Sequence, residues 1–264
     1  MPASGPGKVN EFELLAELER RGLIVGVEHD AAEIGGMVVT QDSLVEGVHF
    51  RFDLLDWREL GFRAAAVNIS DLSASGAEPL ALIVSLAAPS LDGAIALYEG
   101  IAEAGVPVCG GDTTKADIVV ITVTALGRAG RMPGRAGARP GDLLVVTGPL
   151  GGAGAAFRDG RLLRPPIRTA EGRELARVAH AMLDISDGLG PDAGHIAHRS
   201  GCRLVIDLDR VPLADGATID DLSFGEDYEL LAATPDPRGF TVIGRCEEGS
   251  GVEPGGLGGW EHFR

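Results

Sequence analysis

Aspartates flanked by glycine and other small residues recur along the whole chain. Six of them stand at predicted turns or at the ends of predicted elements: Asp30, Asp42, Asp71, Asp112, Asp184 and Asp187. In one shared cleft their carboxylates would repel each other by roughly 1 kcal/mol per pair at about 4 Å in water, and by several times more at lower dielectric. Mg²⁺ relieves such repulsion, because it binds carboxylate oxygens together with water and substrate phosphates. The pattern therefore indicates magnesium-assisted chemistry on a phosphorylated substrate.

Phosphoryl transfer uses this arrangement, since metal ions bridge the donor's phosphates and neutralise charge in the transition state. The chain has no G-x-x-x-x-G-K-[ST] loop, and its two lysines, Lys8 and Lys115, are badly placed for one. Any nucleotide must then be held by metal ions and glycine backbone. Residues 110–114 (GGDTT) suit that role, because the glycines admit a phosphate and Asp112 can hold a metal.

Asp71 lies on a helix that the sequence predicts from about Trp57 onward. Apolar residues recur every three or four positions up to Asp71, which is the spacing of one helical face, and Gly76 supplies a stop. A carboxylate on a closely packed, otherwise apolar helix costs free energy unless a positive group meets it. No Lys or Arg follows Arg63 in this segment, so a divalent cation is the predicted partner of Asp71.

Helices and strands are predicted to alternate in both halves, which places the fold in the α/β (α+β) class. The other predicted helices cover residues 11–21, 91–104, 169–181 and 192–200, and a further one opens near 151. Predicted strands cover residues 37–40, 80–87, 106–108, 118–126, 143–148 and 203–208, so Asp42 and Asp112 are each expected just after a strand. Residues 127–141 are rich in Gly, Arg and Pro, which is typical of a linker. We therefore predict two domains, residues 1–137 and 138–264.

A formal charge of −16 over 264 residues argues against nucleic-acid binding through a basic surface. It is compatible with a phosphorylated ligand held through metal ions. No apolar run reaches the roughly 18 residues that span a membrane, and the first residues lack the form of a signal peptide. We expect a cytoplasmic protein with no membrane partner. The three cysteines are widely spaced and indicate neither a disulfide framework nor a zinc site.

Five motifs in order give the chain a specific resemblance to a known family. They are residues 68–79 (NISDL…GAEP), 110–114 (GGDTT), 139–142 (RPGD), 184–189 (DISDGL) and 225–230 (GEDYEL). In this order and spacing the chain resembles thiamine-monophosphate kinase from about Phe12 to Phe263. That family shares the two-domain fold of aminoimidazole ribonucleotide synthetase. The resemblance therefore implies an N-terminal mixed sheet with helices, followed by a C-terminal α/β domain that is shorter here than in typical members.

The resemblance implies ATP-dependent conversion of thiamine monophosphate to thiamine diphosphate with several Mg²⁺ ions, in a homodimer joined through the N-terminal domains. Matched motif by motif, it implies these metal ligands: Asp30, Asp42, Asp71, Asp112, Asp184 and Asp187. It implies these ATP contacts: Gly111, Asp112, Arg135 and Ser186. It implies that His49, Glu226 and Trp260 contact the thiamine substrate. Because the acceptor is already a phosphate anion, no catalytic base is expected, and alignment and charge neutralisation must supply most of the acceleration.

The chain departs from the family pattern at several positions. The first acid motif reads Glu28-His29-Asp30, where the family has Gly-Asp-Asp, and histidine is a poor ligand for Mg²⁺. Phe224 stands where a second glycine is usual in the glutamate motif. These departures leave open a sibling ATP-dependent enzyme acting on another small substrate, and a degenerate homologue that binds nucleotide or thiamine phosphates without turnover.

Each site residue also has a simpler interpretation when it is taken alone. An aspartate after glycine is often an ordinary turn or cap residue. Taken alone, a histidine such as His49 is more often a buried core residue, and a tryptophan such as Trp260 more often a packing aromatic. An arginine such as Arg135 in an Arg-rich loop is usually solvated. The order and spacing of the five motifs favour the functional interpretation of the acids.

Overall fold

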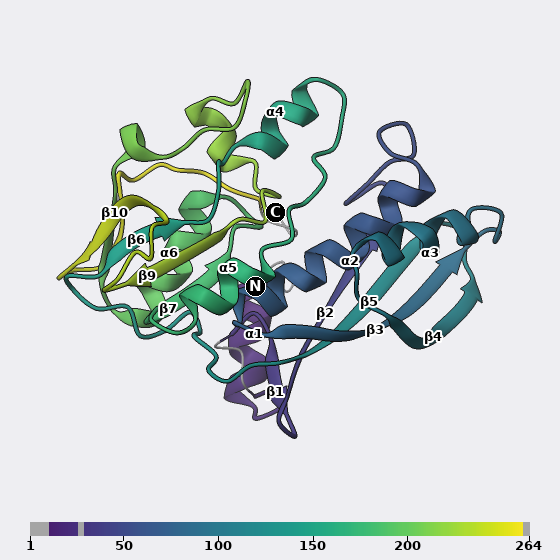
Figure 1. Cartoon of the computed structure of the whole chain (residues 1–264), viewed down its shortest axis with the longest axis horizontal. Coiled ribbons are helices and arrows are strands. Elements are labelled where there is room, and N and C mark those ends of the chain that lie inside the picture. The colour runs from purple at the N-terminus through teal and green to yellow at the C-terminus, as the bar shows by residue number, and fades with distance from the viewer. Residues whose placement is uncertain (1–10, 26–28, 261–264) are drawn as a thin grey trace, which may run out of the picture.

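The computed structural model describes residues 11–25 and 29–260, and its strands form two separate sheets (Figure 1). A helix, α1 (Glu11–Arg20), precedes them. The first sheet is built from residues 32–128 and the second from residues 143–253. In the described part of the chain, no helix is long and apolar enough to cross a membrane.

The first sheet has five strands in the order β1-β2-β5-β3-β4. They are β1 (Ala32–Ile34), β2 (Met37–Val45), β3 (Glu78–Ala88), β4 (Val108–Lys115) and β5 (Val120–Arg128). Neighbours are antiparallel except β3 and β4, which run parallel and are joined through α3 (Ala94–Glu103). Buried and more exposed residues alternate along β3 and β5, so one face carries the core and the other meets solvent.

The helix α2 (Trp57–Ala74) packs on the buried face of this sheet and against α3. Asp56 caps its start by accepting a hydrogen bond from a first-turn backbone N–H at 2.9 Å. Its end is a Schellman motif, in which Gly76 takes a left-handed φ of 67° and the Ala77 N–H donates to the Leu72 carbonyl at 2.8 Å. Fourteen residues of α2 are buried, so this helix is enclosed on all sides rather than amphipathic.

Two glycines let α2 and α3 approach closely. A Cβ on Gly61 of α2 would lie 1.9 Å from the Leu97 carbonyl oxygen, and a Cβ on Gly100 of α3 would lie 1.8 Å from the Arg58 carbonyl oxygen. Neither position has room for a methyl group, so this helix crossing requires glycine at both.

The second sheet has six strands in the order β11-β8-β10-β6-β9-β7. They are β6 (Leu143–Val146), β7 (Ala181–Asp184), β8 (Arg203–Ile206), β9 (Leu230–Thr234), β10 (Thr241–Glu247) and β11 (Gly251–Glu253). Neighbours are antiparallel except β11 and β8. The remaining elements are α4 (Gly152–Arg158), α5 (Thr169–Leu175), α6 (Leu189–Ser200) and the short 3₁₀ helices η1 (Leu208–Arg210) and η2 (Ile219–Ser223).

The strands β6, β9 and β7, which form one side of the second sheet, are buried on both faces. Along β7, Leu183 packs in the core that includes α6, whereas Met182 packs in the core that includes α5 and Ala74 of α2. α2 and α5 also cross closely, since a Cβ on Gly172 would lie 2.2 Å from the Ser73 carbonyl oxygen. α2 therefore belongs to the packing of both halves, and Figure 1 shows it running from the second sheet across the first.

The structure changes several predicted boundaries. α5 ends at Leu175, and Ala181, predicted to end this helix, begins β7 instead. Asp42 and Asp112 lie inside strands that are longer than predicted, not in turns after them. The connection between β5 and β6 contains the predicted domain boundary, which stays a prediction because α2 and α5 pack across it.

Candidate active site

A cavity of about 680 Å³ opens between the two halves of the chain. Ten of the residues predicted to act in the site line it: Asp30, Asp42, Asp71, Asp184, Asp187, Arg135, Ser186, His49, Glu226 and Trp260. The two predicted residues that do not line it are Gly111 and Asp112. Segments far apart in sequence, from Asp30 before β1 to Trp260 at the end of the described residues, thus deliver the predicted side chains to one space.

Asp71 faces this cavity from the last turns of α2. Its Oδ2 accepts a hydrogen bond from the Thr40 hydroxyl of β2 at 2.6 Å. One turn earlier, the buried Asn68 accepts from the Asp42 backbone N–H at 2.9 Å and donates to the Ala64 carbonyl. These bonds fix β2 against α2, which holds the carboxylates of Asp42 and Asp71 on the same side of the first sheet.

Asp184 enters the cavity from the opposite half of the chain, at the end of β7. Its carboxylate accepts a hydrogen bond from the Ser70 hydroxyl, which lies next to Asp71 on α2. Only 5% of Asp184 is exposed. The Ser70 contact therefore joins the two halves directly at the acidic cluster.

Burial and mutual repulsion act together on these acids. The pKa of Asp71 is raised well above its usual value, first by burial and then by the charges of Asp184, Asp42 and Asp30. Burial and the charge of Asp30 raise the pKa of Asp184 to about 7, while the Ser70 hydrogen bond lowers it. Such shifts show that the protein itself supplies too little positive charge for these carboxylates.

Asp30 has an arginine partner. Arg135 Nη2 lies 2.6 Å from Asp30 Oδ1, and its Nε donates to the same oxygen at 2.8 Å. Burial still raises the pKa of Asp30 despite this partner. The predicted ATP contact Arg135 is thus paired with a predicted metal ligand, whereas hydroxyl groups meet Asp71 and Asp184.

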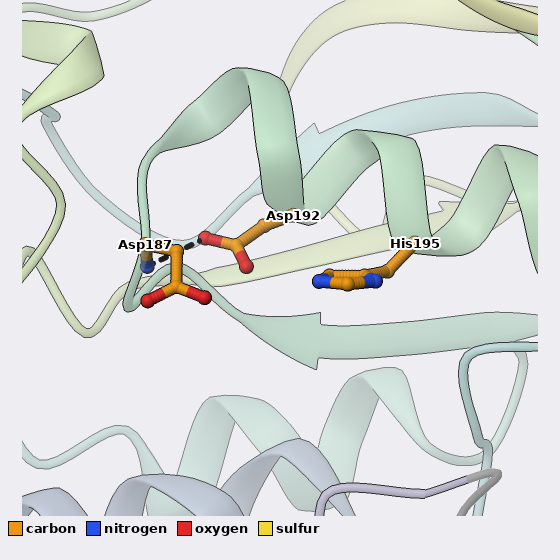
Figure 2. Close-up of side chains that lie close together, drawn as sticks. All are labelled: Asp187, Asp192 and His195. Atoms are coloured by element: carbon orange, nitrogen blue, oxygen red, sulfur yellow. Dashed lines mark hydrogen bonds between the residues drawn. The ribbon is translucent and has the colours of Figure 1, made fainter. Parts of the chain in front are cut away.

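The turn after β7 adds a second acidic group (Figure 2). Asp192 Oδ2 accepts hydrogen bonds from the backbone N–H groups of Asp187 and Gly188, each at 3.1 Å, so it closes the start of α6. Polar atoms of Asp187, Asp192 and His195 lie within 4.8 Å of one another. Burial and the nearby Arg135 lower the pKa of His195 to about 4, so its imidazole is neutral at pH 7.

Sequence reasoning missed Asp192 and His195. Asp192 and His195 lie on α6, which begins just after Asp187. They are three positions apart, which is the spacing of one helical face. That spacing was the available signal. Their position at the cavity depends on how α6 is seated against the second sheet.

The glutamate motif divides its side chains between the site and the framework. Glu226 and Tyr228 line the cavity, with left-handed φ angles of 59° and 53°. Asp227 turns away and accepts from the Gly151 N–H at 2.6 Å, where α4 begins. Glu229 accepts from Arg168 at 2.7 Å. The carboxylates of Asp227 and Glu229 thus hold Glu226 and Tyr228 in the left-handed conformation, which is costly for residues with a Cβ.

Arg63 is a further residue that sequence reasoning did not assign. It lies on α2 with 3% of its side chain exposed, and its Nη2 is 2.7 Å from Glu226 Oε1. Its Nη1 donates to the Leu163 carbonyl at 2.9 Å, and its guanidinium lies 5.9 Å from the Tyr228 ring centroid. An arginine directly before three alanines in α2 was the signal in the sequence, but its partner is far away along the chain.

His49 and Trp260 are not the core residues of the simpler interpretation. His49 is half-buried at the cavity and accepts from the Val45 N–H through Nδ1 at 3.0 Å, so its neutral ring carries the proton on Nε2. Trp260 is 53% exposed, and its backbone N–H donates to the Asp187 carbonyl at 3.0 Å. Their roles as substrate contacts stay predictions.

Gly111 and Asp112 lie on β4, the edge strand of the first sheet, and are exposed. Asp112 pairs with Ser85 of β3, an exposed residue between the buried Val84 and Leu86, so its side chain belongs to the face opposite α2. A Cβ on Gly111 would lie 1.8 Å from the Val84 carbonyl oxygen, which explains glycine there by strand pairing alone. The structure therefore does not bring Asp112 to the other acids within one chain.

The first acid motif is described only in part. Glu28, with residues 26 and 27, lies outside the described residues. His29 lines the cavity, and its Nδ1 is buried with no hydrogen-bond partner in the described part of the chain. His29, at the position where the resemblance implies an aspartate, thus lines the same cavity as the acids.

Comparison with known proteins decides the family. Two family models match: "AIR synthase related protein, N-terminal domain" over residues 28–129, and "AIR synthase related protein, C-terminal domain" over residues 139–252. Thiamine-monophosphate kinase of Pyrococcus horikoshii is 35% identical, with 86% of this chain and 86% of that protein covered. This chain belongs to the thiamine-monophosphate kinase family. The thiamine-monophosphate kinase of Mycobacterium tuberculosis H37Rv is 34% identical, with 97% of this chain and 92% of that protein covered.

A solved structure supports membership of the thiamine-monophosphate kinase family. AaThiL complexed with AMPPCP and TMP matches with a TM-score of 0.89 and 31% identity, over 99% of both chains. The resemblance and the two-domain α/β fold expected from the sequence are therefore confirmed.

Proposed function

We propose that this protein transfers the γ-phosphoryl group of ATP to thiamine monophosphate, giving thiamine diphosphate and ADP. A phosphate oxygen of the acceptor bonds to the γ-phosphorus, and the bond from that phosphorus to the bridging oxygen of ADP breaks. The single observation that supports this most strongly is the convergence of Asp30, Asp42, Asp71 and Asp184 on one cavity, with raised pKa values for three of them. Relatives at 33–35% identity that are named thiamine-monophosphate kinase support the choice of acceptor.

The donor set fits Mg²⁺. Asp71, Asp184 and Asp42 offer hard oxygen atoms, and the repulsion that raises the pKa of Asp71 is what a divalent cation would remove. We propose that Asp30, Asp42, Asp71, Asp184 and Asp187 hold magnesium, which when bound neutralises charge on the transferring phosphates. Thr40 and Ser70 orient two of these carboxylates through their hydroxyl groups.

The cavity lining offers contacts for both substrates. Arg135 pairs with Asp30, and Ser186 lies between Asp184 and Asp187 in the sequence, so we propose that both contact ATP phosphates. Glu226, His49 and Trp260 line the same cavity and would contact the acceptor, since a carboxylate and an aromatic face favour a cationic thiazolium. A phosphate acceptor is already nucleophilic, so we assign no catalytic base, and the residues act by alignment.

We further propose a homodimer in which the face of the first sheet opposite α2 is the contact surface. Ile83 is 41% exposed on this face of β3, two positions from the exposed Ser85. Because Asp112 and Gly111 lie at this sheet's edge, they would reach ATP or metal only in a site completed by a second copy. A cytoplasmic location stays a prediction.

The direct test is to incubate the purified protein with ATP, Mg²⁺ and thiamine monophosphate. We expect equal amounts of thiamine diphosphate and ADP, separated by chromatography, and no product when a chelator is present. Failure to form the diphosphate with Mg²⁺ or with other divalent cations would contradict the proposal. ATP turnover with a different acceptor would instead support the sibling enzyme, and tight binding of both ligands without turnover would support the degenerate homologue.

A further inference from the structure

Three aromatic side chains gather at the rim of the site cavity. Phe157 of α4, Phe224 at the end of η2, and Trp260 line the site cavity and also a second, adjacent cavity of about 510 Å³. The chain has only eight Phe, two Trp and two Tyr, so three of them at one rim is a marked concentration. Phe157 is 46% exposed and Trp260 53% exposed. Their position between two cavities points to contact with a ligand.

Phe157 and Phe224 form a defined pair. Their ring centroids are 5.2 Å apart and the ring planes are inclined by 35°. Neither belongs to the core clusters of the described residues, so the pair is not needed to fill an interior. Aromatic faces left in water at the mouth of a polar cavity are typical of a binding surface.

The framework beneath the pair is held firmly. Gly154 allows the close approach, since a Cβ there would lie 3.1 Å from Phe224 Cβ. Arg158 of α4 forms an ion pair with Asp221 of η2. The Asp227 carboxylate fixes the start of α4, because it accepts hydrogen bonds from the backbone N–H groups of Gly151 and Ala153. The two rings are therefore preorganised on connected elements before any ligand arrives.

The charge around the pair selects the kind of ring that would lie against it. Glu226 and Asp187 line the same cavity, and the chain carries a net charge of −16. A planar cation gains both from these carboxylates and from the negative face of an aromatic ring. We propose that Phe157 and Phe224 form one wall of a subsite for the cationic thiazolium ring of the acceptor, and that Phe224 tightens acceptor binding. This inference rests on the proposed function and deepens it.

The proposal predicts a specific pattern of ligand binding. Dissociation constants for thiamine, thiamine monophosphate and ATP are measured by calorimetry on the wild type and on Phe224→Leu and Phe157→Leu. Leucine keeps an apolar group of similar size and removes the π face. We expect each variant to weaken thiamine and thiamine monophosphate binding about tenfold, the size of a partly desolvated cation–π contact, and to leave ATP binding unchanged. The phosphate ester of the uncharged thiazole alcohol should bind all three proteins equally.

Two further variants keep the test independent of folding. Phe52→Leu is the matched control, because Phe52 is a 37% exposed aromatic that contacts Trp57 and lines neither cavity. It should bind thiamine like the wild type. Phe224→Gly removes the ring altogether, and we expect retained kcat with a higher KM for the acceptor.

Three results would overturn the subsite. They are wild-type affinity for thiamine in Phe224→Leu, an equal loss of ATP binding, and a wild type that binds neither thiamine nor its monophosphate. Wild-type protein that binds thiamine through Phe224 but does not phosphorylate the monophosphate would support the subsite while contradicting the proposed function. The two proposals can thus fail separately.

Discussion

The guanidinium of Arg63 lies 2.7 Å from Oε1 of Glu226 and joins the longest helix of the first half to the glutamate motif of the second. The two partners differ in exposure, with 3% of the Arg63 side chain and 26% of the Glu226 side chain accessible. Arg63 does not line the cavity, whereas Glu226 does. Arg63 is therefore a positioning residue that holds the Glu226 carboxylate at the cavity.

This asymmetry predicts unequal losses of stability. Glu226→Gln leaves a buried guanidinium without a counter-charge, and we expect a loss of about 2 kcal/mol in the free energy of unfolding, less than for a fully buried pair. Arg63→Met removes the buried charge itself and leaves a carboxylate that water can reach, so we expect a loss of about 1 kcal/mol or less. Urea denaturation of both variants checks the order. A larger loss for Arg63→Met than for Glu226→Gln would contradict it.

Asp71→Asn should separate stability from activity. The amide still accepts the Thr40 hydrogen bond but removes one charge from the repelling set, so we expect the metal-free variant to melt at the same or a higher temperature. Turnover should fall at least about a hundredfold, as when an electrostatic contact in the transition state is lost. Asp117→Asn, at an exposed acid outside the cavity, is the control. Near-normal turnover in Asp71→Asn would remove Asp71 from the metal set.

The stability of the metal-free protein should fall as the pH rises. The pKa of Asp184 is raised to about 7 in the folded protein, above the ~3.9 of an unfolded aspartate, so the folded state binds this proton more tightly. Between these two values, each rise in pH therefore lowers the contribution of Asp184 to stability, and the loss is complete above about pH 7. Thermal melts in a chelator at several pH values test this. We expect Asp184→Asn to flatten the profile.

Added Mg²⁺ should counteract the loss of stability at high pH. The ion competes with protons for the same carboxylates, so it should raise the melting temperature more at about pH 8 than at about pH 5. A shift of equal size at both values would show that Mg²⁺ binds away from the acids with raised pKa values. Asp71→Asn should reduce the shift at the higher pH.

The surroundings of two helical glycines, Gly61 of α2 and Gly194 of α6, predict opposite effects for their Gly→Ala changes. In Gly61→Ala the new methyl group would lie 1.9 Å from the Leu97 carbonyl oxygen, so we expect a loss of about 1–3 kcal/mol from overpacking. Gly194 lies within α6 with nothing within 4 Å of a Cβ, and Gly194→Ala should gain up to about 1 kcal/mol from helix propensity. Denaturation midpoints of the two variants check both signs.

The proposed dimer predicts a concentration-dependent mass. Ile83→Arg places a charge on the exposed face of β3 without touching the core, since the neighbouring Leu82 and Val84 carry the buried contacts. We expect this variant to sediment as a monomer and to keep its melting profile at low protein concentration. Ile95→Arg on α3, where Ile95 is 75% exposed, is the matched control and should remain dimeric. Equal masses for the two variants would argue against this surface.

Local sequence patterns determined much of the fold and of the site. The spacing of small and apolar residues indicated α2, and Gly76 marked its end, because helix periodicity and a left-handed C-terminal glycine are properties of neighbouring residues. The ordered motifs indicated the family, and ten of the twelve predicted site residues line one cavity. Their chemistry could be predicted because a carboxylate in closely packed, apolar surroundings costs free energy unless a cation meets it.

Tertiary structure alone decided where those motifs act. Asp112 looked like a turn residue, but pairing of β4 with β3 draws it into a strand and turns its side chain away from α2. The partnership of Arg63 with Glu226 depends on how the two halves dock. Strand register and domain packing are set by contacts between residues far apart in sequence, so no local pattern reveals which side chains will meet. The sequence by itself thus determined the set of reactive groups, and only the folded chain decided which of them share a site.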